Sequence, residues 1–382
     1  MDDAVGVIVF VGPGLTSFEQ LAACAGRLGV ETWWIGYPYS RARRWRTRLF
    51  VPRVSTAHDQ KSLVTELRRL GADRIIDIQA SEYVLGDVVA AAREAQVTPS
   101  VVEALERRLA LSDKLSMSRL LSDHGVPVPA ALDAALVSAQ EAADRLGLPL
   151  VVKGRVANGG SSVHIVFTAA EAELAIRAVQ VYGGGIYETH LTGESLSYGA
   201  SFGPDGQVLH EAAYLTRRLG HLEHLPPDRI LVVDDTATLA SGRAVVAALG
   251  GSGLVNVNVI KDSDGCASVH DVNLRPWGTL MALRGAGVDF THDYLAILGL
   301  AAASSPEAAL AVGEQFDVFP TAALGIAETD LLAGLALLLV QSRQYADWTG
   351  ARYVVAESAR CLAIAARRLL PGRRRAVSQQ HP

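Results

Sequence analysis

Val269–Pro276 reads V-H-D-V-N-L-R-P, a short strand pattern that carries polar side chains at alternate positions. In a strand, Asp271, Asn273 and Arg275 would lie on one face of a sheet, because successive side chains point to opposite faces. A carboxylate beside an amide oxygen offers the hard ligands that suit Mg²⁺, and arginine is a permanently charged anion binder. The stretch indicates a site that handles phosphate or acyl phosphate. The simpler alternative is that Asp and Asn cap a turn at the strand end.

The length and composition define the class of protein. A chain of 382 residues is too long for one ordinary hydrophobic core, so two or three domains are expected. Hydrophobic residues make up 49% and charged residues 20% of the chain, as in soluble globular proteins. The formal net charge of −5 gives no general reason to expect nucleic acid or an anionic membrane as a partner.

The cysteines and the apolar segments bear on the compartment. Cys24, Cys266 and Cys361 are isolated in the sequence, which fits a reducing environment better than a disulfide framework or a zinc site. The N-terminus lacks the basic and apolar segments of a secretory signal. Leu331–Val340, the longest apolar run near the end, has about half the length that spans a bilayer. We therefore expect a cytoplasmic enzyme.

The first 100 residues predict a small, doubly wound α/β domain of the Rossmann-like type, because strand and helix patterns alternate. Strand patterns occupy Val5–Val11, Glu31–Gly36 and Arg74–Ile78, and helical patterns follow Gly14 and occupy Leu63–Leu70 and Asp87–Ala95. The turn Gly12-Pro13-Gly14 is not G-x-G-x-x-G, and Pro13 lacks an N–H for an anion. A dinucleotide site is not expected here.

Two lysines occupy positions where a lone positive charge is unfavourable. Ser112 is the expected N-cap of a helix that ends near Gly125, and Lys114 lies in its first turn, where the helix dipole gives no reason for a cation. Lys153 interrupts the apolar strand Leu150–Gly154, where a charge is costly without an anionic partner. Lys114 is thus incidental or placed for a bound anion, and Lys153 requires an acidic partner.

A polar loop and two hairpins follow. Asn158–Ser162, N-G-G-S-S, precedes a strand at Val163–Phe167, and its backbone N–H groups could cradle phosphate oxygens or merely form a flexible hairpin loop. Beyond it, hairpins predict an antiparallel β body with helices packed on it. They pair Ser197–Phe202 with Val208–Tyr214 and Leu254–Lys261 with Ala267–Asn273.

In order and spacing, seven motifs resemble the ATP-grasp superfamily, in its branch of carboxylate–amine or carboxylate–thiol ligases. They are S-D-K at 112–114, G-V-P-V-P at 125–129, V-V-K-G at 151–154, N-G-G-S-S at 158–162, I-Y-E-T-H-L-T-G-E at 186–194, N-V-N at 256–258 and D-V-N-L-R-P at 271–276. The resemblance covers about residues 1–300 and implies an ATP-grasp fold behind a Rossmann-like, pre-ATP-grasp domain.

The resemblance and the patterns together predict four parts. They are the pre-ATP-grasp domain at 1–105, an entry helix with the lid subdomain at 106–190, the antiparallel β body at 191–305, and a helical region with a basic tail at 306–382. The last part is Ala- and Leu-rich, with helical spacing in Leu331–Gln341 and Ala351–Leu370. It packs on the body or forms a homodimer interface.

The resemblance also implies roles for individual residues. ATP phosphates would be held by Lys114 and Lys153 and covered by the lid residues Gly159, Gly160, Ser161 and Ser162. The adenine would face Glu188 and the backbone near Leu191, and the ribose would bind Glu194. Mg²⁺, or Mn²⁺, would be held by Asn258, Asp271 and Asn273, and Arg275 would steady the transferring phosphate.

The metal set departs from the family pattern. The family more often has Glu at the position of Asp271, and Asp, Glu or Gln at the position of Asn258. The site therefore contributes a single carboxylate, and Mg²⁺ would depend heavily on ATP oxygens.

The reaction implied is an ATP-dependent ligation. A small carboxylate, an amino acid or peptide, would be phosphorylated to an acyl phosphate with Lys153 and Arg275 neutralising charge, and an amine would then displace phosphate. The alternatives are an ATP-grasp carboxylase or other acyl-phosphate-forming enzyme, and a nucleotide-binding protein without turnover. The hypothesis of a nucleic-acid-binding module is supported only by the arginine runs Arg41–Arg48 and Arg367–Arg375. These runs are more simply interpreted as a solvated loop and a solubilising tail.

Arginines between the two hairpins are candidates for the substrate site. Arg217 and Arg218 could bind the substrate carboxylate through a bidentate contact. His221 and His224 have a spacing that a metal could use, but no third ligand is evident. The other histidines give no catalytic signal, and alternation predicts that His270 faces away from Asp271.

Overall fold

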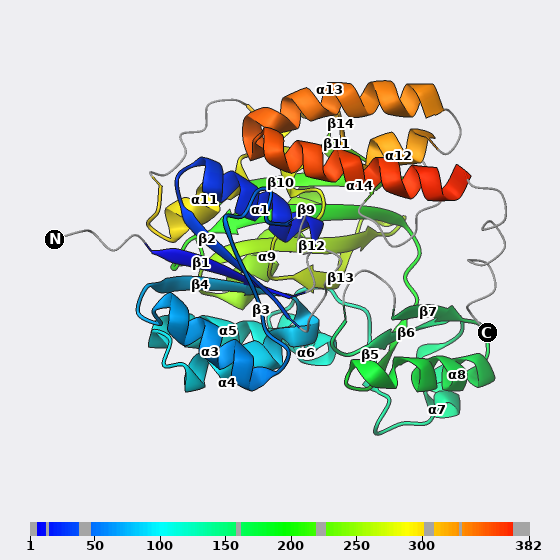
Figure 1. Ribbon diagram of the computed structural model, residues 1–382. Helices are drawn as coiled ribbons and strands as arrows, with labels where there is room; N and C mark the ends of the chain where they lie inside the picture. Colours follow the sequence, from blue (N-terminus) through cyan, green and yellow to red (C-terminus); the bar gives the residue numbers. More distant parts are fainter. Residues whose placement is uncertain are drawn as a thin grey trace.

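The computed structural model describes residues 6–12, 15–37, 47–157, 162–218, 227–301, 309–327 and 331–369 (Figure 1). The strands form three separate sheets, one of four parallel strands, one of six antiparallel strands and one of four antiparallel strands. The mixed α/β and α+β fold class predicted from the sequence is confirmed.

The N-terminal sheet has the strand order β3-β2-β1-β4. Its strands are β1 (Val7–Val11), β2 (Glu31–Gly36), β3 (Arg53–Thr56) and β4 (Ile75–Ala80). Ile8 and Phe10 share a buried cluster with α1 (Thr16–Arg27), while Val7, Val9 and Val11 share another with helices of the opposite face. Those helices are α3 (Gln60–Leu70), α4 (Leu85–Glu94) and α5 (Pro99–Ser112). The continuous apolar run of β1 thus reflects burial on both faces of the sheet.

The body sheet has the order β13-β12-β9-β10-β11-β14. Its strands are β9 (Glu194–Phe202), β10 (Val208–Arg217), β11 (Arg229–Val233), β12 (Gly253–Lys261), β13 (Ala267–Asn273) and β14 (Gln315–Asp317). Both predicted hairpins are present. β14 corrects the prediction that 306–382 is helical only, since Gln315–Asp317 pairs with β11. A strand of three residues is too short to show a periodicity.

Helices cover both faces of the body sheet. One face packs against α6 (Lys114–Asp123) and α9 (Thr236–Leu249). The other face joins a core that includes α1, α10 (Leu280–Gly285) and α11 (Phe290–Ile297). That core continues into the C-terminal helices, so the N-terminal domain, the body and the helical region are packed together.

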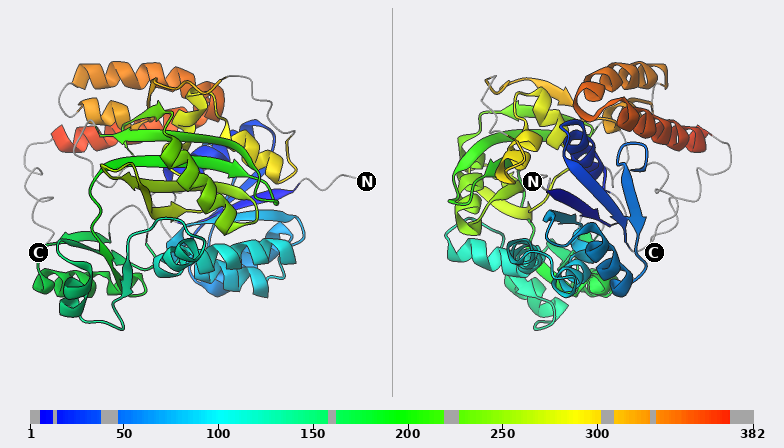
Figure 2. Two further views of the ribbon diagram at one scale, coloured as in Figure 1. Left: turned by 180° about the vertical axis from the view of Figure 1, so that it is seen from behind. Right: turned by 60° about the vertical axis from the view of Figure 1, so that its left-hand side comes forward.

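The C-terminal helices lie above the body sheet in Figure 1, and the rear view in Figure 2 agrees. They are α12 (Thr321–Ala327), α13 (Leu331–Thr349) and α14 (Ala351–Leu369). Tyr345 of α13 is buried against Phe319, with ring centroids 4.8 Å apart, and Tyr353 of α14 meets Phe50 at 5.1 Å. The first contact lies within the C-terminal region, and the second fixes α14 to the N-terminal domain. No helix in the described ranges combines the length and apolarity needed to cross a bilayer.

The segment predicted as the lid forms a small sheet with its own hydrophobic core, and this sheet lies below the body sheet in Figures 1 and 2. Its strands are β5 (Ala131–Asp133), β6 (Leu150–Gly154), β7 (Val163–Val166) and β8 (Gly185–Thr189), in the order β5-β8-β6-β7. One face is covered by α7 (Ala139–Leu146) and α8 (Ala169–Val179). The opposite face carries Lys153 and Glu188.

Helix α9 packs so closely on the body sheet that one position requires glycine. A Cβ atom at Gly242 would lie 2.3 Å from Cγ of the fully buried Tyr198. We expect Gly242→Ala to lower the free energy of unfolding by about 1–3 kcal/mol, measured by urea denaturation. Gly26→Ala in α1 is the control, since its Cβ would have no neighbour within 4 Å, and it should be neutral or stabilising. Equal stability of the two variants would contradict this close packing.

Candidate functional site

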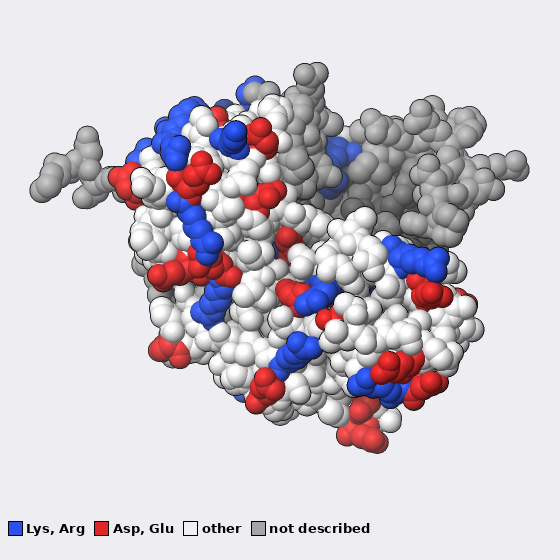
Figure 3. Space-filling model, turned by 90° about the horizontal axis from the view of Figure 1, so that it is seen from below, with Lys and Arg blue, Asp and Glu red and all other residues white. Residues whose placement is uncertain are grey.

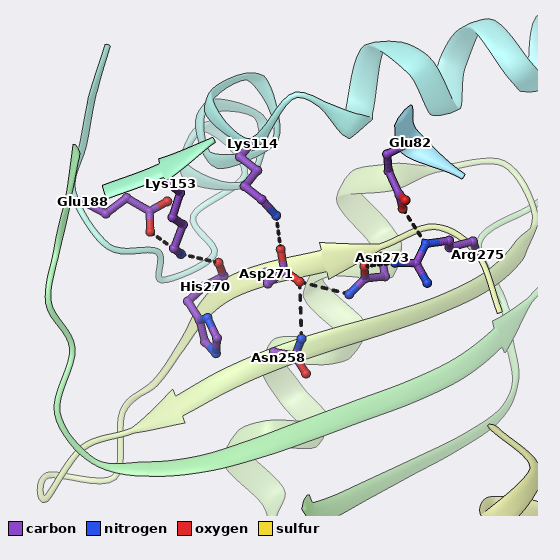
Figure 4. Close-up of polar contacts among 9 residues, drawn as sticks. All are labelled: Glu82, Lys114, Lys153, Glu188, Asn258, His270, Asp271, Asn273 and Arg275. Atoms are coloured by element: carbon purple, nitrogen blue, oxygen red, sulfur yellow. Dashed lines mark hydrogen bonds and ion pairs between the residues drawn. The ribbon is translucent and has the colours of Figure 1, made fainter. Parts of the chain in front are cut away.

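Polar side chains of β12 and β13 form a connected row (Figure 4). Asn258 lies opposite Asp271 in the antiparallel ladder. Nδ2 of Asn273 donates to Oδ2 of Asp271 at 3.0 Å, and Nδ2 of Asn258 approaches the same oxygen at 3.4 Å. Nη2 of Arg275 donates to Oδ1 of Asn273 at 3.2 Å. The structure thus brings Asp271, Asn273 and Arg275 together on one side, as their spacing predicts.

A β-bulge interrupts the same strand at His270. Asn258 pairs with Asp271, but the next residue, Val259, pairs with Val269, which leaves His270 as an extra residue. Simple alternation, from which we expected His270 to face away from Asp271, therefore does not apply across this point. The bulge also lets Val269 and Val272 share the core beneath α6 and α9.

Lys114 is the first residue of α6 and forms an ion pair with Asp271. The N-cap is Asp113, whose Oδ1 accepts from the backbone N of Ser116 at 2.8 Å. The prediction of Ser112 as the cap is wrong by one residue. Ser112 is instead the last residue of α5, and its hydroxyl donates to the carbonyl of Leu109. Only Asp113 separates the two helices.

Lys153 of β6 has the acidic partner that its buried position requires. It forms an ion pair with Glu188 of the neighbouring strand β8, and the two side chains are only 7% and 5% exposed. The Lys153 ammonium also donates to the backbone carbonyl of His270 at 3.0 Å. Lys153 therefore connects the lid sheet to the body sheet at the polar row.

Arg275 pairs with a residue that sequence reasoning missed. Nε of Arg275 lies 2.5 Å from Oε1 of Glu82, and both side chains are mostly buried. Glu82 begins a short 3₁₀ helix, η1 (Glu82–Val84), directly after β4 of the N-terminal domain. An acid just past the carboxyl end of a parallel strand is the signal that could have indicated it, because ligands of open α/β sheets bind at that edge.

The opposite charges at the site keep Asp271 and Lys114 in their charged forms, as the directions of their pKa shifts indicate. Burial alone would raise the pKa of the Asp271 carboxyl, but Lys114, followed by Lys153, holds that pKa well below its usual value. Burial would lower the pKa of Lys114, but Asp271, followed by Glu188 and Glu82, raises it. Both partners of the Lys114–Asp271 pair are therefore charged at neutral pH.

A cavity that is partly open to solvent adjoins the polar row. Its polar wall includes Glu82, Lys114, Glu188, Asp271 and Asn273, and apolar side chains of α6 and β13 form much of the rest. Residues of the N-terminal domain, the lid and the body thus converge on one cavity.

Comparisons with known proteins agree with this architecture. No protein-family model matches the chain. D-alanine–D-alanine ligases of Stutzerimonas stutzeri and Gloeobacter violaceus are each 30% identical, over 205 and 201 residues. These segments cover 49% and 47% of this chain, and 64% and 65% of the relatives. The chain thus spans slightly less than two thirds of the length of the curated relatives it matches.

Solved structures share the fold over most of the chain. Carboxyaminoimidazole ribonucleotide synthase of Aspergillus clavatus is 17% identical, with a TM-score of 0.61 over 78% of both chains. L-amino acid ligase of Bacillus licheniformis is also 17% identical, with a TM-score of 0.55 over 75% of this chain and 72% of that chain. This chain has the ATP-grasp fold. The resemblance inferred from the seven sequence motifs is confirmed at the level of fold.

Some residues predicted for the ATP-grasp site lie away from the cavity wall. Glu194 begins β9 and approaches Lys261 at 3.5 Å, and Leu191 lies in the segment between β8 and β9. Arg217 ends β10, two strands from β12, and Arg218 follows it. Neither these arginines nor Leu191 and Glu194 line the cavity. Lys153, Asn258 and Arg275 are not part of its lining either, but each contacts a residue that is, namely Glu188, Asp271 and Asn273. Their roles stay predictions.

The lid loop is described only at its end. Ser162 is buried, and its carbonyl accepts from the backbone N of Gly154 at 3.1 Å. The other predicted loop residues and several arginines and histidines lie outside the described residues: Gly159, Gly160, Ser161, Arg41, Arg43, Arg44, Arg46, His221 and His224.

The polar row fits a metal that is bound together with phosphate. No cluster of three or more His, Cys, Asp or Glu side chains in the described ranges could hold a metal ion by itself. The row instead supplies the Asp271 carboxylate and the amide groups of Asn258 and Asn273. Mg²⁺ is commonly held by one or two carboxylates with phosphate oxygens and water, so these residues suit it when a nucleotide completes the ligands.

His270 makes the stability of the protein sensitive to acid. Burial, and after it the charge of Lys153, lowers the pKa of His270 from 6.5 to about 4, and its Nε2 atom has no hydrogen-bond partner. The unfolded chain therefore binds a proton first as the pH falls below about 6.5, and stability is lost down to about pH 4. When the pH is lowered from 7 to 4.5, the wild type should therefore lose about 2 kcal/mol more unfolding free energy than His270→Gln loses. Urea denaturation of both proteins at the two pH values checks this prediction. A difference in unfolding free energy that is the same at pH 7 and at pH 4.5 would contradict it.

Proposed function

We propose that this protein is an ATP-dependent ligase that activates a small carboxylate as an acyl phosphate and joins it to an amine, releasing ADP and phosphate. The observation that carries the proposal is the polar row beside the cavity, in which Lys114 pairs with Asp271, Arg275 donates to Asn273 and Lys153 donates to the backbone carbonyl of His270. Three cations beside a hard-oxygen row suit a triphosphate whose charge must be neutralised while a phosphoryl group moves.

The contacts of these residues support a proposed role for each. Lys114 and Lys153 would bind ATP phosphates, and Arg275 would steady the phosphoryl group at the boundary with the N-terminal domain. Mg²⁺, or Mn²⁺, held by Asp271, Asn258 and Asn273, would offset negative charge on the phosphate oxygens. Glu82 adds a carboxylate at the same boundary that can hold a cationic amine. The division of the chain at residues 105, 190 and 305 is part of this proposal, supported by the separate core of the lid.

The relatives favour an amino acid or a peptide as the carboxylate substrate. The sequence relatives are D-alanine–D-alanine ligases, and one structural neighbour is an L-amino acid ligase. A carboxylase is the second candidate, because carboxyaminoimidazole ribonucleotide synthase and biotin carboxylase of Campylobacter jejuni are also neighbours. Arg217 and Arg218 remain proposed contacts for the substrate carboxylate, and a homodimer through the C-terminal helices remains proposed.

The test is nucleotide product formation by purified protein with ATP and Mg²⁺. We expect ADP and phosphate to form only when pooled amino acids and small carboxylic acids are supplied, and subdividing the pool then identifies the substrates. Product formation that needs bicarbonate would favour the carboxylase. AMP and pyrophosphate would overturn the acyl-phosphate route, and tight ATP binding without any product across widened pools would favour a non-catalytic nucleotide-binding protein.

A further inference from the structure

Arg155 follows Gly154 of β6 and joins three segments of the chain. Its Nε donates to Oδ2 of Asp113 at 2.7 Å, and its Nη1 approaches Oδ2 of Asp133 at 3.3 Å. Its backbone carbonyl accepts from the backbone N of Lys114 at 3.0 Å. The Arg155 side chain is 27% exposed, so these contacts are partly shielded from water.

The contacts fix the start of α6. Asp113 uses Oδ1 to cap the helix and Oδ2 to bind Arg155, while the N–H of Lys114, one of the first-turn donors without an intrahelical partner, bonds to Arg155. The first residue of α6 is thereby held against the end of β6, two residues beyond Lys153. These contacts tie Lys114 to the segment of chain that carries Lys153.

This connection links parts that are otherwise packed separately. Met117 and Leu121 place α6 in the core of the body, whereas Leu150 and Val152 place β6 in the core of the lid. Arg155 and Asp113 bridge these two cores next to the cavity. Arg155 does not line the cavity, and its Nε and Nη1 atoms contact carboxylates at the start of α6 and on β5, so its side chain joins these two segments.

We propose that Arg155 is a positioning residue that holds Lys114 and Lys153 at the spacing required by a triphosphate. The inference rests on the proposed function, in which these two lysines bind ATP phosphates. Asp133 steadies the guanidinium from the lid side through its second contact. Loss of this clamp should weaken binding of the phosphates and leave contacts to the nucleoside unchanged.

Calorimetric titration with a non-hydrolysable ATP analogue and with adenosine, both in the presence of Mg²⁺, tests the proposal. For Arg155→Met we expect about tenfold weaker binding of the analogue, since small misplacements of binding groups have effects of this order. Adenosine affinity should change less than about twofold. Arg155→Lys should lie between the wild type and Arg155→Met, because an ammonium retains the charge but lacks the fork that reaches both acids.

Two further variants make the result decisive. Arg177→Met is the matched control, because it removes an arginine of the lid whose exposed pair with Glu173 lies on α8. It should leave both affinities unchanged. In a Lys114→Met background, Arg155→Met should have no added effect beyond about twofold, since the residue that it positions is already absent.

Three outcomes would overturn the positioning role. They are equal weakening of the analogue and of adenosine, full additivity with Lys114→Met, and unchanged affinities in both Arg155 variants. If Arg155→Met lowers the melting temperature sharply, Arg155→Lys carries the same comparison. Absence of nucleotide binding by the wild type would instead overturn the proposed ATP site itself, so the two failures are distinguishable.

Discussion

Lys153→Met is expected to reduce ATP-dependent turnover by about 10²–10³-fold, the scale of removing one preorganised electrostatic contact. Lys153 is nearly inaccessible to solvent and lies between Glu188 of the lid and the His270 carbonyl of the body. Methionine keeps the length of the side chain and its apolar packing but cannot neutralise a phosphate. Measurement of ADP formation at saturating ATP separates this loss from weaker nucleotide binding.

The same substitution should also destabilise the fold. Glu188 would be left buried without its cation, and breaking a buried ion pair from one side costs about 3–5 kcal/mol. The double variant Lys153→Met/Glu188→Gln removes the uncompensated charge and should recover most of the unfolding free energy without recovering turnover. Recovery of turnover in the double variant, or full activity in Lys153→Met, would contradict the role of Lys153 at the phosphates.

Asp271→Asn is expected to raise the Mg²⁺ concentration required for turnover by more than the roughly 10–100-fold that loss of an outer-shell metal partner costs. Asp271 is the one carboxylate in the proposed metal set, and Asn258 and Asn273 contribute only neutral amides. The substitution keeps the shape of the side chain and removes its charge. Titration of activity against Mg²⁺ at fixed ATP measures the change.

Asp271→Asn has a second expected effect that concerns Lys114. Without the carboxylate, Lys114 loses its ion-pair partner and becomes available to phosphates, so nucleotide binding in the absence of Mg²⁺ should strengthen. Asp235→Asn is the control, since Asp235 caps α9 and pairs with Lys261 outside the cavity. An unchanged Mg²⁺ requirement in Asp271→Asn, or the same change in Asp235→Asn, would show that the metal assignment is wrong.

A few neighbouring residues are enough to predict those parts of the site that depend on local burial or on strand alternation. A lysine inside an apolar strand requires an acid, and the acid proved to be Glu188 on the adjacent strand. Alternation places Asp271, Asn273 and Arg275 on one side, and they are hydrogen-bonded in a row. In the fold, the buried run of β1 and the two hairpins of the body have equally clear patterns.

Other features depend on contacts that no local pattern records. Glu82 meets Arg275 across 193 positions of sequence, and only the packing of two domains brings them together. The bulge at His270 shifts the register by one residue without changing the apolar pattern around it. The sequence patterns did not predict helix α9, because its apolar residues are spread over several sides instead of one. It also contains Gly242, which permits close packing on Tyr198 but is unusual in an exposed amphipathic helix.

The three ion pairs beside the cavity bear on which anions the proposed site would bind. Lys114, Lys153 and Arg275 are each already matched by a carboxylate, so an arriving anion meets a locally balanced surface instead of a positive well. A small anion such as inorganic phosphate could displace at most one carboxylate and would gain little by the exchange. A polyphosphate that brings its own divalent cation would give Asp271 a new counter-ion while its oxygens take over the lysines, so we expect the proposed site to favour such a ligand over small anions.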